Sequence, residues 1–124
     1  MSSAFSDFIH FTGVITSPNF PDDYPNNLQK TETIRTKKGM IMEIEFTAFK
    51  LYSDYSDWLT IRDGNGSILM DKKYGDALPT KILSHTNVVQ FEFVTNSYGT
   101  STGWRATWTA VTPAGSTGDD SILI

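Results

Sequence analysis

The fold class follows first from one stretch of the chain, Met40-Ile41-Met42-Glu43-Ile44-Glu45-Phe46-Thr47-Ala48. Its even positions are apolar and its odd positions are mostly polar, which is the pattern of a strand with one buried face. The same two-residue period runs through residues 88–94 and 103–111, whereas a 3.6-residue period is nearly absent. The sequence therefore predicts strands rather than helices.

The apolar positions of these strands also predict the core. Residues 88–94 place three apolar side chains on one face, and residues 103–111 place four on one face. The two tryptophans among them are expected to be core aromatics rather than a surface on which sugars stack. The predicted core residues are Val89, Phe91, Phe93, Trp104, Ala106, Trp108 and Ala110.

A tight turn is predicted at Asp63-Gly64-Asn65-Gly66, between apolar residues at 59–61 and 68–70. Glycine and asparagine tolerate positive φ, so this segment is typical of a hairpin. Shorter strands are predicted at residues 13–17, 31–35 and 80–84. Strands that recur at short intervals, broken by Pro and Gly, predict an all-β, antiparallel two-sheet sandwich of the jelly-roll type.

Length and composition limit the classes of protein that the chain can represent. The chain has 124 residues, 39% of them hydrophobic and 19% charged, which suits one folded domain and is unlike a disordered chain. Its net charge of -4, with ten Lys and Arg residues, excludes the basic surface of a nucleic-acid binder. Its apolar runs fall short of the ~20 residues that cross a bilayer, so no membrane insertion is expected. We predict a folded unit at residues 4–111 and a flexible linker or tail at 112–124, where small and polar residues dominate.

The sequence contains no sign of catalytic chemistry. It has no cysteine and no G-x-S-x-G nucleophile motif. Its two histidines, His10 and His85, lie on different predicted segments without H-E-x-x-H spacing. The chain is therefore predicted not to be an enzyme.

Two short segments carry candidate sites. Asp54 and Asp57 lie in a polar, aromatic loop before a predicted strand, where oxygen ligands for calcium can converge, although an ordinary solvated loop is the alternative. Asn65-Gly66-Ser67 matches the N-x-S acceptor sequence for N-linked glycans and makes Asn65 a glycosylation candidate.

Five blocks of sequence follow one another in order along the chain. They are Gly13 to Pro21 with the following Tyr24-Pro25-Asn26-Asn27; Phe46-Thr47-Ala48-Phe49-Lys50-Leu51; Ser56-Asp57-Trp58-Leu59-Thr60-Ile61-Arg62-Asp63-Gly64; Gly75-Asp76-Ala77-Leu78-Pro79; and Gly103-Trp104-Arg105-Ala106-Thr107-Trp108. Together these blocks resemble the CUB domain family. This resemblance implies a two-sheet jelly-roll sandwich and an extracellular location, although the absence of cysteine by itself favours a reducing compartment.

The chain departs from the family pattern at the cysteines. Lys30, Asp54 and Tyr74 stand where the family usually has cysteine, and Glu32 stands where a tryptophan is common. The resemblance therefore implies that both family disulfides are missing. Packing of the core must offset the missing bridges.

The resemblance also implies a calcium site at one end of the sandwich. Tyr24 and Asp57 match the family's site, whereas Tyr52 and Asn96 stand where it has acidic ligands. With two carboxylates missing, we expect calcium, the candidate cofactor, to bind weakly or not at all, unless Asp54 substitutes.

By resemblance, the chain is expected to be a non-catalytic extracellular protein-interaction module. It would be part of a larger multidomain protein, such as a secreted protease, and would position a protein partner or substrate through its loops. The alternative is a carbohydrate-binding role similar to that of the spermadhesins, through exposed aromatic residues such as Tyr55. The expected partner-binding residues are Tyr24, Tyr52, Asp57, Asn96 and Tyr98.

Overall fold

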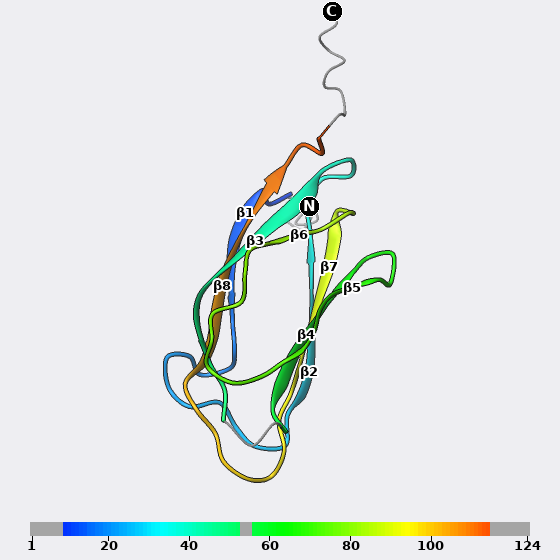
Figure 1. Cartoon of the computed structure of the whole chain (residues 1–124). Coiled ribbons are helices and arrows are strands. Elements are labelled where there is room, and N and C mark those ends of the chain that lie inside the picture. Colours follow the sequence, from blue (N-terminus) through cyan, green and yellow to red (C-terminus); the bar gives the residue numbers. More distant parts are fainter. Residues whose placement is uncertain (1–8, 53–55, 115–124) are drawn as a thin grey trace, which may run out of the picture.

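The computed structural model describes residues 9–52 and 56–114, which form eight strands and no helix (Figure 1). The strands build two four-stranded antiparallel sheets, so the expectation of an all-β sandwich is confirmed. No helix that could cross a membrane is found in the described part of the chain. The strands are β1 (Thr12–Thr16), β2 (Gln29–Arg35), β3 (Ile41–Lys50), β4 (Trp58–Asp63), β5 (Ile68–Lys73), β6 (Ile82–Leu83), β7 (Val88–Val94) and β8 (Gly103–Val111).

In each sheet, the two central strands are paired with each other although they lie far apart in the sequence. One sheet has the order β1-β8-β3-β6 and the other has the order β2-β7-β4-β5. Chain neighbours such as β7 and β8 therefore lie in different sheets, which is the crossing pattern of a jelly roll. The predicted strand at 80–84 is shorter than expected, because β6 pairs with β3 only through Ile82 and Leu83.

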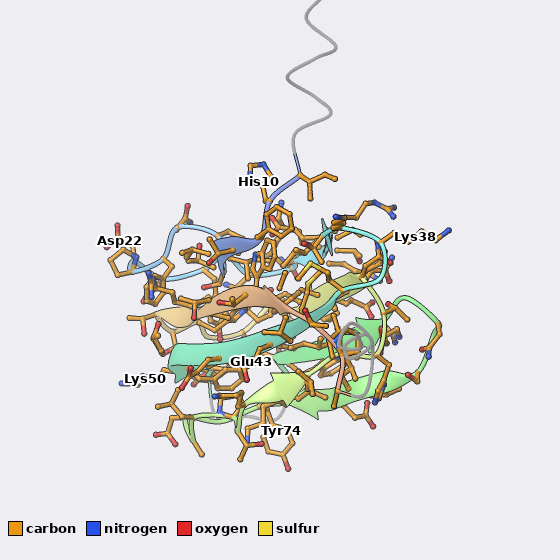
Figure 2. All side chains as sticks on the ribbon, turned by 90° about the horizontal axis from the view of Figure 1, so that it is seen from above. His10, Asp22, Lys38, Glu43, Lys50 and Tyr74 are labelled. Carbon is orange, nitrogen blue, oxygen red and sulfur yellow. The ribbon has the colours of Figure 1, made fainter. Side chains whose placement is uncertain are left out.

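The core lies between the two sheets. Trp104 is 2% exposed, its ring stacks on Phe91 at 5.5 Å between centroids, and Phe93 meets it edge-on at 5.9 Å. Trp108 is 5% exposed, so both tryptophans are core residues as predicted. Charged side chains such as Asp22, Lys38 and Lys50 point away from this core (Figure 2).

A bulge in β3 changes which residues face the core. Met42, Ile44 and Phe46 are buried, as the alternation predicts, but the register with β8 shifts between Phe46 and Ala48. Phe49 then takes the buried position, at 5% exposure. One extra residue in a strand moves the following side chains to the opposite face, so the simple alternation holds only as far as Phe46.

The two ends of the sandwich differ (Figure 1). We call one of them the loop end; it comprises residues 17–28, 51–57 and 95–102, of which 53–55 lie outside the described residues. The β4–β5 hairpin lies at the opposite end, together with the start of β1 and the end of β8.

Candidate functional site

The centre of the loop end is the carboxylate of Asp57, which is completely buried. Its Oδ2 accepts a hydrogen bond of 2.7 Å from the hydroxyl of Tyr24, itself 1% exposed. Its Oδ1 accepts a hydrogen bond of 2.9 Å from the backbone amide of Asn96. One side chain that precedes β4 thus connects the loop before β2 with the loop after β7.

Tyr24 extends this network to the third loop. Its hydroxyl oxygen accepts a hydrogen bond of 2.8 Å from the amide of Tyr52, and its own amide donates to the carbonyl of Ser101 at 3.1 Å. Its ring meets Phe93 edge-on, with 5.0 Å between centroids. The hydroxyl is therefore fixed from the core side, and all three segments of the loop end are held by two side chains.

The outer surface of the loop end carries two aromatic rings. Tyr98 is 68% exposed and meets the half-buried Tyr52 edge-on at 5.9 Å. The amide of Tyr98 donates to the side-chain oxygen of Asn96 at 3.1 Å, which fixes the turn below the ring. Gly99 lies so close to Tyr52 that an added Cβ would come within 2.5 Å of its ring, so a glycine permits this approach.

An open pocket of about 240 Å³ lies beside Tyr52. Lys50 and Asp76 supply opposite charges to it, and Ser101 supplies a hydroxyl. Sequence reasoning missed this pocket, because Gly75 to Pro79 signalled only a family turn and nothing local connects it with residues 50–52. The residues that line the pocket are Lys50, Leu51, Tyr52, Gly75, Asp76 and Ser101.

The structure brings together most of the residues that the sequence singled out for this end. Tyr24, Asp57 and Asn96 form one hydrogen-bonded network, and Tyr52 and Tyr98 lie on its outer side. Because Tyr24 and Asp57 are buried, they can hold the loops but offer almost no surface to a partner. Asp54 and Tyr55, which were also singled out, lie outside the described residues.

The described residues of this network do not fit a calcium ion. Calcium takes six to eight oxygen ligands, several of them carboxylate oxygens. Among the described residues, Asp57 supplies the one carboxylate of this network, and each of its two oxygens already accepts a protein hydrogen bond. Within residues 9–52 and 56–114, no group of three or more His, Cys, Asp or Glu residues could hold a metal ion.

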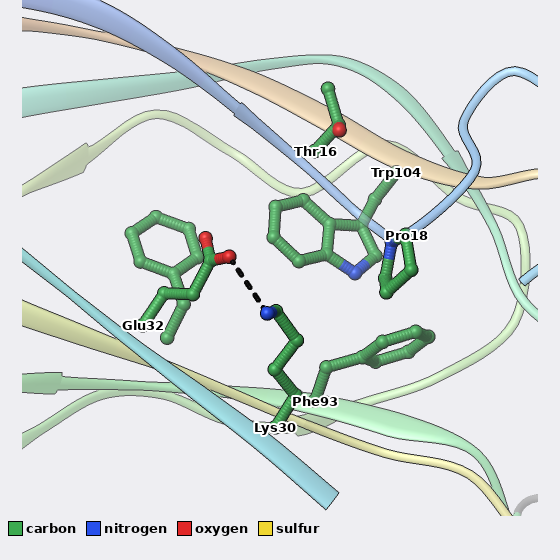
Figure 3. Close-up of a pocket in the computed structure, with 7 residues that line it drawn as sticks. Thr16, Pro18, Lys30, Glu32, Phe93 and Trp104 are labelled. Atoms are coloured by element: carbon green, nitrogen blue, oxygen red, sulfur yellow. Dashed lines mark ion pairs between the residues drawn. The ribbon is translucent and has the colours of Figure 1, made fainter. Parts of the chain in front are cut away.

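Lys30 and Glu32 are two of the residues at which the sequence was expected to depart from the family pattern. Their side chains form an exposed ion pair of 3.3 Å above a hollow lined by core aromatics (Figure 3). The hollow has room for about 10 Å³, at most a single water. The indole N–H of Trp104 lines it and is, among the described residues, the one buried side-chain polar atom without a hydrogen-bond partner. This hollow is too small to be a ligand site.

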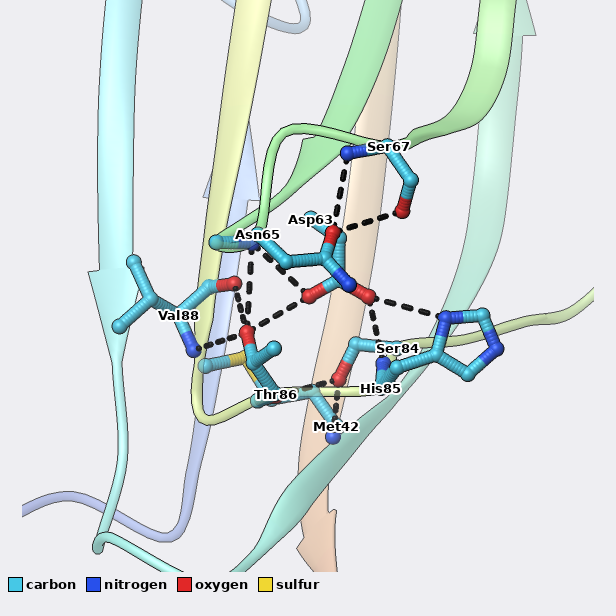
Figure 4. A network of polar contacts seen from close by, with 9 residues as sticks. Met42, Asp63, Asn65, Ser67, Ser84, His85, Thr86 and Val88 are labelled. Atoms are coloured by element: carbon cyan, nitrogen blue, oxygen red, sulfur yellow. Dashed lines mark hydrogen bonds and ion pairs between the residues drawn. The ribbon is translucent and has the colours of Figure 1, made fainter.

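A second buried carboxylate, that of Asp63, holds the opposite end of the sandwich (Figure 4). Its Oδ1 accepts from the Thr86 hydroxyl at 2.6 Å and the Gly64 amide at 2.8 Å, and its Oδ2 accepts from the His85 amide at 2.6 Å. Burial alone would raise the pKa of Asp63. The hydrogen bonds from Thr86, His85 and Gly64, with the charge of the His85 ring, instead hold this pKa below 3.8.

The lowered pKa predicts how Asp63 contributes to stability. A carboxyl whose pKa is lower in the folded chain stabilises the fold above its unfolded pKa, and this contribution is lost as pH falls through the folded pKa. We expect Asp63→Asn to lower the free energy of unfolding at pH 7 by about 2 kcal/mol, since hydrogen bonds to a charged acceptor are lost. The deficit should shrink as pH falls below 3.8. Urea unfolding at a series of pH values measures it, with the exposed Asp71→Asn as control; a deficit that does not depend on pH would contradict the assignment.

Comparisons with known proteins agree with the fold. The family model for the CUB domain matches residues 5–108. Human cubilin is 35% identical over 113 residues, which cover 86% of this chain and 3% of cubilin. Chicken astacin-like metalloendopeptidase is 34% identical over 104 residues, which cover 79% of this chain and 25% of that protein. The crystal structure of the MASP-1 CUB2 domain bound to Ca²⁺ superimposes with a TM-score of 0.75 at 25% identity, covering 82% of this chain and 95% of that one.

This chain belongs to the CUB domain family. CUB domains are non-catalytic modules. In cubilin and the astacin-like enzyme, the matching segment is a small part of the whole protein. The chain spans 3% of cubilin and 25% of the astacin-like enzyme. Among the described residues, the site consists of a buried hydrogen-bonded network below an exposed aromatic surface.

Proposed function

We propose that this chain is a non-catalytic extracellular module that binds a protein partner through its loop end, as one part of a larger multidomain protein. The observation that carries this proposal is the support that the buried Tyr24–Asp57 pair gives to the exposed ring of Tyr98. Exposed tyrosines on a fixed backbone are typical centres of protein binding, because they bury a large area and lose little conformational entropy. The compartment is supported by the likeness to the solved extracellular region of zebrafish Gpr126/Adgrg6, with a TM-score of 0.75 and 26% identity.

The structure of the MASP-1 CUB2 domain contains Ca²⁺. We further propose that in this chain hydrogen bonds to Asp57 hold the loops together without a bound ion. The Tyr24 hydroxyl and the Asn96 amide each donate to one of the Asp57 oxygens, so a cation would compete with both hydrogen bonds for the lone pairs of this carboxylate. Millimolar calcium should therefore leave the melting temperature within about 1 °C of its value in chelator, because a ligand that does not bind the folded state cannot stabilise it. A clear rise with calcium that Asp54→Asn removes would contradict this proposal and assign the ion site to Asp54.

Substitution of Tyr98 tests the partner-binding surface. We expect Tyr98→Ala to weaken binding to a secreted protein partner about tenfold or more, since the loss of a central aromatic contact commonly costs more than 1 kcal/mol. Partners are selected from a display library of secreted proteins, and their affinities are measured by biolayer interferometry. Phe11→Ala is the matched control, because Phe11 is an exposed aromatic residue at the opposite end, 48% exposed.

Three results would count against the proposed surface. Equal losses for Tyr98→Ala and Phe11→Ala would show that the effect is not specific to the loop end. A loss confined to Phe11→Ala would place the surface at the opposite end. Binding to a glycan array that requires Tyr52 and Tyr98 would favour the carbohydrate alternative, which stays a prediction.

A further inference from the structure

The acceptor sequence Asn65-Gly66-Ser67 lies at the tip of the β4–β5 hairpin (Figure 4). All three residues are exposed, and Gly66 has a φ of +92° that closes the turn, with its amide donating to the Asp63 carbonyl at 2.9 Å. The turn is held from below by the buried Asp63 carboxylate, which accepts the Gly64 amide at 2.8 Å. The tip is thus presented to solvent on a rigid base.

The hydrogen bonds of this turn leave the side-chain amide nitrogen of Asn65 accessible. The side-chain oxygen of Asn65 accepts a hydrogen bond of 2.7 Å from the Ser67 hydroxyl and one of 2.9 Å from the Ser67 amide. Both bonds polarise the carboxamide, and they leave its Nδ2 without a hydrogen bond to any described residue. A Cβ added at Gly66 would meet nothing within 4 Å, so there is room for a bulky substituent around the tip.

From this geometry we infer that Asn65 is a site of N-linked glycosylation. The donor is an oligosaccharide linked through a diphosphate to a lipid, delivered by the transferase of the secretory pathway. The Nδ2 of Asn65 forms a bond to C1 of the first sugar, the bond between C1 and the diphosphate oxygen breaks, Nδ2 loses one proton, and the lipid diphosphate leaves. The serine hydroxyl two residues later distinguishes this asparagine from the others.

The position of Asn65 makes this modification compatible with partner binding. β4 runs from the loop end, where Asp57 precedes it, to the hairpin at the opposite end, so the two sites are separated by the length of a strand (Figure 1). A glycan on Asn65 leaves the surface of Tyr52 and Tyr98 open. The inference relies on the extracellular location in the proposed function but not on any particular partner.

Expression of the full chain behind a signal peptide in a eukaryotic cell tests this inference. Asn65-Gly66-Ser67 is the only N-x-S/T segment in the 124 residues, so a glycan released by peptide N-glycosidase reports on Asn65 alone. We expect the intact mass of the secreted wild type to fall on enzyme treatment. The variants Asn65→Gln and Ser67→Ala should be secreted without a glycan, and Ser67→Thr should retain it.

Secretion of the wild type at its unmodified mass would overturn the inference, as would a glycan that persists in Ser67→Ala. Both results are independent of the proposed function, because the signal peptide imposes the route and no partner enters the measurement. Binding of the Asn65→Gln variant to a partner should equal that of the wild type within about twofold; a large loss would show that the hairpin end takes part in binding, and would overturn the separation of the two sites.

Discussion

Replacing Asp57 with alanine is expected to lower the free energy of unfolding by about 3 kcal/mol, because it leaves the Tyr24 hydroxyl and the Asn96 amide without their acceptor. Each buried polar group that loses its partner costs about 1–3 kcal/mol. For a domain of this size the loss corresponds to a fall in melting temperature of about 10 °C or more. Thermal and urea unfolding measure both quantities.

Hydrogen exchange separates a local effect of Asp57→Ala from a general one. The amide of Tyr52 donates to the Tyr24 hydroxyl and the amide of Asn96 donates to Asp57, so both should exchange faster in the variant relative to amides of the central strands β3 and β8. The exposed Asp22→Ala is the matched control, because the Asp22 side chain lies on the same loop end outside this network. If Asp22→Ala and Asp57→Ala destabilise the chain equally, the role of Asp57 in holding the loops is wrong.

Replacing Gly103 with alanine should have an effect of similar size, about 3 kcal/mol, for two physical reasons. Gly103 has a φ of +91°, which costs a residue with a side chain about 1–2 kcal/mol. An added Cβ would also collide with the side chain of Ser17, where overpacking costs about 1–3 kcal/mol. The Ser17 hydroxyl accepts the Trp104 amide at 3.0 Å, so Ser17 cannot move aside without breaking that bond.

Gly39 provides a matched control for this substitution. It has almost the same backbone conformation, with a φ of +94°, but a Cβ there would meet nothing within 4 Å. Gly39→Ala should therefore lose only the conformational part, about 1 kcal/mol. Equal losses in urea unfolding for Gly39→Ala and Gly103→Ala would show that the contact with Ser17 does not constrain β8.

A large part of the fold could be predicted because strand patterns are local. The alternation in residues 40–48, 88–94 and 103–111 predicts Met42, Phe91 and Trp104 in the core, and the structure confirms this, whereas Ala110, which was also expected there, is only half-buried. The sequence pattern predicts β2 less clearly, because an exposed edge strand can have a mostly polar sequence. The shift at Phe46 could not be predicted, because a bulge depends on the partner strand.

The candidate site was predicted as a set of residues but not as an arrangement. Family strings identified Tyr24, Asp57 and Asn96, and the structure joins them by hydrogen bonds. The burial of Tyr24 and Asp57 could not be predicted, because both residues lie in polar segments that are typical of exposed loops. Their role in holding the loops from below was therefore not predicted either. The pocket beside Tyr52 requires Asp76 to approach from a distant turn, which no local pattern encodes.

The amino-acid sequence alone predicted where most strands lie, which side of β7 and of β3 as far as Phe46 faces the core, the family, and the hairpin turn that contains the Asn65-Gly66-Ser67 motif. These features depend on neighbours within a few residues, or on strings that keep their order along the chain. The pairing of Asp57 with Tyr24 and Asn96, and the fit of Gly103 against Ser17, arise only when segments tens of residues apart are packed together. Whether a carboxylate binds an ion or a hydroxyl depends on which oxygens and protons the fold brings to it, and that is a property of the packed loops.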